Sequence, residues 1–109
     1  MLMAAEKKYV EIGARLRALR MALHSDMSIT DYTKMMEVNY TRYLNWESGL
    51  NRPQPNEAVV FCEKLGATLD FIYRGIETAL AQSTAKALAE RPELKAHNKS
   101  KDSPDSSAV

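Results

Sequence analysis

A group of outward-facing side chains between residues 40 and 45 is the feature of this sequence best suited to recognition chemistry. In a helix from Tyr40 to about Ser48, Tyr43 and Trp46 stand at i and i+3 and turn inward together. The opposite side of this helix carries Tyr40, Thr41, Leu44 and Asn45. A shorter helix precedes it across a tight turn, and this pairing is typical of a helix–turn–helix, which puts its second helix into the major groove of DNA. The chemistry expected here is therefore recognition of a DNA duplex.

The elements that position this helix have clear local signals. Ser28 is a good N-cap for the preceding helix, and Asp31 stands in its first turn. The inward face of that helix is predicted from the spacing of Tyr32, Met35 and Met36. The pattern breaks at residues 37–39, Asn39 can cap the next helix, and Gly49 supplies its C-terminal stop. Together these signals predict two short helices joined by a tight turn.

The rest of the first 75 residues also has helical patterns and no alternating strand pattern. One helix is expected over residues 9–23, and another begins at Pro55 or Asn56 after a loop with two prolines. The inward stripe of that later helix is predicted to be Val59, Val60, Phe61 and Leu65. A short fifth helix is expected over residues 69–74. Residues 1–75 are therefore predicted to form an all-α, compact five-helix bundle.

Beyond this bundle we expect a helical extension over residues 76–91 and a disordered polar tail over residues 92–109. The extension has a thin apolar stripe that needs a partner surface, made of Leu80, Ala81, Ala85, Leu88 and Ala89. Two interpretations are open. The helix packs on its own domain, or it is a dimerisation arm, which we favour because a helix–turn–helix repressor needs to read two half-sites.

Five segments of the chain resemble the phage repressor and Cro-type (XRE-like) helix–turn–helix family. They are Ile12–Arg20, Trp46–Gly49, Arg52–Pro53, Leu65–Gly66 and Leu69–Ile72. They occur in the order of that family over about two-thirds of the chain. The resemblance implies a lambda-repressor-like DNA-binding fold whose third helix reads the major groove.

Functional residues follow by position from this resemblance. It implies base contacts from Tyr40, Thr41, Leu44 and Asn45. It implies phosphate contacts from Ser28, Ile29, Asn51 and Arg52, whereas Arg42 is either a further phosphate contact or a solvated charge. The Asn45 amide can pair bidentately with adenine, and Leu44 can contact a thymine methyl group. The resemblance also implies an internal ion pair between Arg20 and Glu47, and it puts Glu37 where the family commonly has a turn glycine.

Composition limits the other classes of function. The formal net charge is only +1, so bulk charge does not indicate a nucleic-acid partner. Cys62 is the only cysteine, which excludes an internal disulfide and favours a reducing, cytoplasmic location. No apolar run is long enough to span a membrane, and His24 and His97 are too far apart to suggest a metal site. The sequence has no nucleophile arrangement or glycine-rich phosphate loop, so we expect no catalysis and no cofactor.

The sequence therefore predicts a sequence-specific DNA-binding transcriptional regulator of the repressor type, acting as a homodimer on a palindromic site in double-stranded DNA. The alternative is a protein-interaction module on the same fold, such as the antitoxin of a toxin–antitoxin pair. The near-neutral charge and the apolar residues Ile29 and Leu44 favour this alternative, in which the main partner is a protein.

Overall fold

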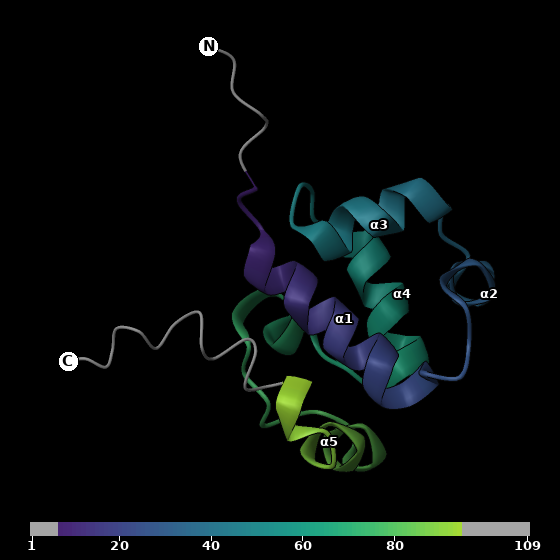
Figure 1. Cartoon of the computed structure of the whole chain (residues 1–109). Helices are drawn as coiled ribbons and strands as arrows, with labels where there is room; N and C mark the ends of the chain where they lie inside the picture. The colour runs from purple at the N-terminus through teal and green to yellow at the C-terminus, as the bar shows by residue number, and fades with distance from the viewer. Residues whose placement is uncertain (1–6, 95–109) are drawn as a thin grey trace.

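All secondary structure in the computed structural model of the chain, which describes residues 7–94, is helical (Figure 1). The helices are α1 (Val10–His24), α2 (Ile29–Met36), α3 (Tyr40–Ser48), α4 (Pro55–Leu65), η1 (Asp70–Arg74) and α5 (Gln82–Ala89). A last helical turn covers residues 92–94. The predicted all-α class is confirmed. The described residues form seven helical segments, however, rather than a five-helix bundle with one further helix, and the fifth segment is a π-helix.

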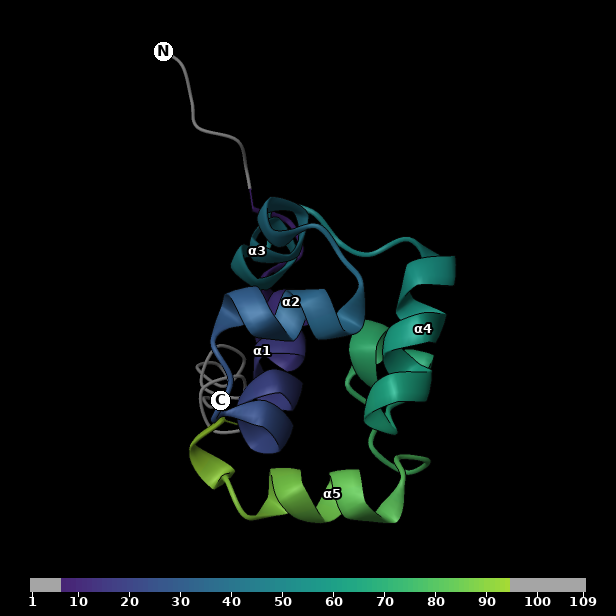
Figure 2. The same ribbon diagram turned by 90° about the vertical axis from the view of Figure 1, so that its right-hand side faces the viewer.

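Helix α1 contacts α3, η1 and α5 and so connects most of the fold. Figure 2 shows α3 at one end of α1 and α5 at the other. The contact with α3 is made backbone to backbone at Gly13. A Cβ atom on Gly13 would lie 2.4 Å from the carbonyl oxygen of Glu47 and 2.5 Å from that of Trp46. Glycine at this position therefore sets how closely α1 and α3 approach.

An aromatic cluster forms the core beneath α3. Tyr43 and Trp46 are both fully buried, as their spacing predicts. The Tyr43 ring is stacked on that of Phe61 with centroids 5.9 Å apart, and it lies 5.5 Å from the ring of Tyr32. Trp46 meets Phe61 edge to face at 5.7 Å. These rings come from α2, α3 and α4, so the inner side of α3 is packed against both neighbouring helices.

Three side chains predicted to face inward are instead exposed. Val59 and Val60 of α4 are each 40% exposed, because the buried row of this helix is Ala58, Phe61 and Leu65. Met35 of α2 is 37% exposed. In α2 the buried row is Tyr32, Thr33 and Met36, and the Thr33 hydroxyl is satisfied by donating to the carbonyl of Thr30. In both helices the buried face is rotated about the helix axis, by part of a turn, from the face that the sequence predicts.

The predicted caps around the turn between α2 and α3 are present. The Ser28 hydroxyl accepts the Asp31 N–H at 3.0 Å, and the Asn39 side chain accepts the Arg42 N–H at 2.9 Å. Glu37 ends α2 in the left-handed conformation, with a φ of 62°. Gly49 ends α3 in the same region. These conformations turn the chain sharply and fix the direction in which α3 leaves α2.

The apolar side of α5 packs against other parts of this chain. Leu88 is buried in the core, and the buried Thr84 hydroxyl donates to the carbonyl of Leu65 at the end of α4. Ala81, Ala85 and Ala89 are exposed. The packing therefore follows the first of the two interpretations, a helix docked on its own domain. The buried side of α5 is the row of Thr84 and Leu88, four residues apart, and is narrower than the apolar stripe that the sequence predicts.

The predicted disordered tail does not begin at residue 92. Residues 92–94 are helical, Leu94 is buried, and the guanidinium of the neighbouring Arg91 donates to the carbonyl of Met21 at 2.9 Å. The buried side chain of Leu94 and the hydrogen bond from Arg91 to α1 thus hold this turn against the rest of the fold. The rest of the predicted tail, residues 95–109, lies outside the described residues.

Candidate nucleic-acid interface

The side chains with predicted base contacts share the outer side of α3. Tyr40 and Thr41 are exposed, and Leu44 and Asn45 are half-buried. The Asn45 side chain makes no hydrogen bond to any residue between 7 and 94, whereas its carbonyl accepts N–H groups of the following loop. A side-chain amide that is held on a helix, with donors and an acceptor that no described residue uses, is suited to bidentate hydrogen bonding.

At the start of α2, the two residues with predicted phosphate contacts differ in what they offer. The Ser28 hydroxyl already accepts the Asp31 N–H, and the Ile29 side chain packs against the core. The backbone N–H groups of this first turn and the Ser28 O–H, which is still a donor, can therefore meet an anion. The Asp31 carboxylate in the same turn is exposed and opposes the approach of a phosphate.

The loop between α3 and α4 presents a second group of predicted phosphate contacts. Asn51 and Arg52 are exposed, and the Arg52 guanidinium lies over the ring of Tyr9, 4.8 Å from its centroid. The loop is anchored by Pro53, which is buried and accepts the Tyr73 hydroxyl at its carbonyl. An open hollow of about 360 Å³ is lined by Tyr9, Arg42, Trp46, Asn51, Arg52 and Gln54. Predicted phosphate contacts from α3 and from the loop thus meet around one space.

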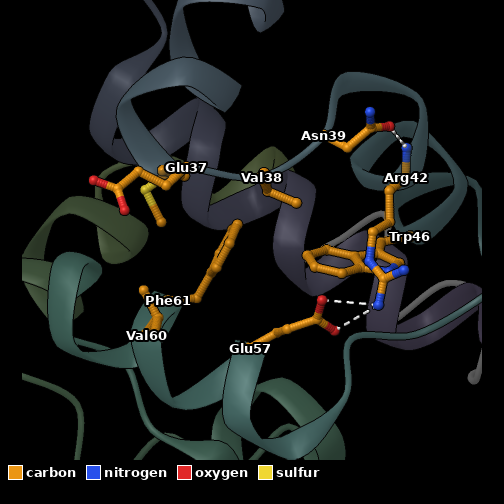
Figure 3. A pocket seen from close by; sticks show the side chains of 9 residues that line it. Glu37, Val38, Asn39, Arg42, Trp46, Glu57, Val60 and Phe61 are labelled. Atoms are coloured by element: carbon orange, nitrogen blue, oxygen red, sulfur yellow. Dashed lines mark hydrogen bonds and ion pairs between the residues drawn. The ribbon is translucent and has the colours of Figure 1, made fainter.

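Arg42 also forms an ion pair within the protein, which the sequence did not indicate. Its Nη2 atom lies 2.8 Å from Oε2 and 3.0 Å from Oε1 of Glu57 in α4, as Figure 3 shows. The guanidinium also lies over the Trp46 ring, 5.7 Å from its centroid. Oε1 of Glu57 accepts the Gln54 N–H at 2.8 Å, which caps the start of α4.

The electrostatics of Glu57 follow from these contacts. Partial burial disfavours the carboxylate, but the hydrogen bonds from Arg42 and from the Gln54 N–H outweigh it and lower the pKa of Glu57. Sequence reasoning did not single out Glu57. The signal was available, since a glutamate three residues after Gln54 and just inside a helix start marks a capping box.

A second hollow, of about 230 Å³, lies between the turn that joins α2 to α3 and the outer side of α4 (Figure 3). Its lining includes the apolar side chains of Val38, Val60 and Phe61. Nearby, the Lys64 ammonium donates to the carbonyl of Met35 at 3.0 Å. This contact ties the end of α2 to α4 and so supports the turn that orients α3.

The ion pair implied by the family resemblance is present. Arg20 meets Glu47 through two bonds, Nε to Oε2 at 2.7 Å and Nη2 to Oε1 at 3.0 Å. The Tyr43 hydroxyl also donates to Oε2 of Glu47. Hydrogen bonding to Glu47 raises the pKa of Arg20, and burial raises the pKa of Tyr43, so Arg20 keeps its charge and Tyr43 keeps its proton at neutral pH. This network joins α1 to α3 at Tyr43 and Glu47, one turn apart on the inner face of α3.

Comparison with protein-family models, with curated proteins and with solved structures finds no match for this chain. None of the helices between residues 7 and 94 has the length and apolar character needed to cross a bilayer.

Proposed function

We propose that this protein is a sequence-specific DNA-binding regulator, repressor-like in action, that inserts α3 into the major groove. The observation that carries the proposal is the geometry of α3. Its inner side is held by buried Tyr43 and Trp46 and by the Glu47 ion pair, and its outer side presents Asn45 and Tyr40 from a rigid element. Rigid presentation of polar and apolar side chains on one helix face is what direct reading of bases requires.

The proposal includes a homodimer, because two copies of such a helix can read two half-sites of a palindrome about 34–36 Å apart. Leu88 and Thr84 do not supply the interface, since they are buried within their own chain. Light scattering at tens of micromolar tests this part of the proposal. A mass of one chain for the free protein, and of one chain plus one duplex for the complex, would count against the homodimer.

The experiment that tests the function is selection of bound fragments from a pool of random duplexes, at low and near-physiological salt. Wild type is compared with Asn45→Ala and with Gln82→Ala, a control on the exposed side of α5. We expect wild type and Gln82→Ala to enrich the same short palindrome, and Asn45→Ala to lose preference at one base position by about 1–3 kcal/mol. Binding that disappears with salt and enriches no motif would contradict the proposal.

The second candidate is a protein-interaction module such as an antitoxin. The exposed apolar residues Met35, Val59 and Val60 favour it, since they lie on helices that flank the hollow beside the turn. A selection without any motif, together with a toxin-sized neighbouring gene whose product binds this chain, would make this candidate the better one.

A further inference from the structure

Arg42 is the only cation on α3, and it stands beside the outer side of that helix. Its side chain is 49% exposed and lines the same hollow as Asn51 and Arg52. The guanidinium is therefore accessible to a phosphate that approaches the loop after α3. Its bonding capacity, however, is directed to Glu57 of α4.

A carboxylate and a phosphate are similar ligands for a guanidinium, because both present two oxygens that accept hydrogen bonds in parallel. Glu57 holds both oxygens close to Arg42 and is itself fixed by the Gln54 N–H. A phosphate at this position must displace Glu57. Otherwise it is repelled by the Glu57 carboxylate, which lies about 3 Å from the arginine nitrogen that the phosphate would bind.

We propose that Glu57 occupies the phosphate position at Arg42 and so withholds one phosphate contact from duplexes of arbitrary sequence. The inference rests on the proposed function and names a residue that sets its specificity. An ion pair as exposed as this one is weak and can be broken. On a preferred site, base contacts hold the DNA in register, and a correctly placed phosphate displaces Glu57. On other sequences no phosphate is held there, and the pair persists.

The test measures binding to a short duplex of mixed sequence as a function of salt, for wild type and Glu57→Gln. Glutamine can keep the capping box, so the start of α4 should be preserved. We expect the slope of log affinity against log salt to steepen by about 0.9 in Glu57→Gln, the value for one added phosphate contact. An unchanged slope would overturn the proposal.

Two further variants separate a contact through Arg42 from a general effect of charge. Glu63→Gln makes the same charge change at an exposed position of α4, and it should leave the slope close to that of wild type. Glu57→Gln should also have no effect when Arg42 is alanine. Equal steepening by Glu63→Gln, or steepening without Arg42, would overturn the proposal. If neither wild type nor Glu57→Gln binds any duplex at low salt, the proposed function itself fails, which is a different result from equal binding.

Discussion

Arg20 in α1 and Glu47 in α3 form a two-bond ion pair whose side chains are only 10% and 11% exposed. The two residues are 27 positions apart in the sequence, and their bond connects α1 to the C-terminal end of α3. Each charge is removed from water and depends on the other for compensation. The orientation of α3 relative to α1 is therefore controlled by this bond as well as by the aromatic core.

Replacing Arg20 with alanine should lower the free energy of unfolding by about 3–5 kcal/mol, because the Glu47 carboxylate is left buried without its partner. Urea unfolding followed by the fluorescence of Trp46, the only tryptophan, measures the change. Arg17→Ala, at an exposed position of α1, is the control and should change stability by less than about 0.5 kcal/mol. Equal effects of the two variants would contradict a special role for the ion pair.

Replacing Gly13 with alanine should destabilise the fold by about 1–3 kcal/mol or more, although alanine is the better helix former. The added methyl group would overlap the carbonyl oxygens of Trp46 and Glu47, so α1 and α3 must separate. The change in melting temperature, followed by circular dichroism, shows whether the variant is less or more stable than wild type. An increase would mean that helix propensity outweighs the contact and that the two backbones can move apart at little cost.

Replacing Glu37 with glycine should stabilise the protein by about 1 kcal/mol, because Glu37 has a positive φ that glycine adopts without a steric penalty. The variant loses only a distant contact with Lys64, 3.9 Å away at an exposed position. Glu37→Gln is the matched control, since it removes the same charge but keeps the strained backbone. If both variants had the same stability, backbone strain at this turn would be negligible.

The Arg42–Glu57 pair should give the stability a dependence on pH. Its contribution is fully present above the ordinary pKa of a glutamate, about 4.3. Because the folded-state pKa of Glu57 is lowered, the contribution is lost as the pH falls through that lower value. Wild type should exceed Glu57→Gln by up to about 1 kcal/mol at pH 7, and the gap should close under strongly acidic conditions. Urea unfolding at several pH values measures it, and a gap independent of pH would contradict an ionic origin.

Local chemistry explains what could be predicted from the sequence. Ser28, Asn39 and Gly49 end or begin helices through bonds and backbone conformations within a few residues, so their roles were predicted and are present. The inward rings of α3 were also predicted, because Tyr43 and Trp46 are the large apolar residues at helical spacing there.

The errors concern contacts made by distant segments. Val59 and Val60 belong to an apolar run, and only the neighbours of α4 decide which part of the run is buried. The role of Glu57 depends on where Arg42 lies after folding, and that position is set by the packing of Trp46 in α3 against Phe61 in α4. The helical turn at residues 92–94 depends in the same way on the carbonyl of Met21, which accepts from Arg91.

The bond from Arg91 to the Met21 carbonyl joins segments 70 residues apart, and α5 packs on the helix that contains Met21. A ribosome adds about 5–20 residues per second, so Arg91 is synthesised roughly 4–14 s after Met21 of α1. During that time the apolar side chains of Leu16 and Leu19 have no complete core to enter. We expect the nascent chain to present α1 to chaperones until α5 and the helical turn at residues 92–94 have emerged.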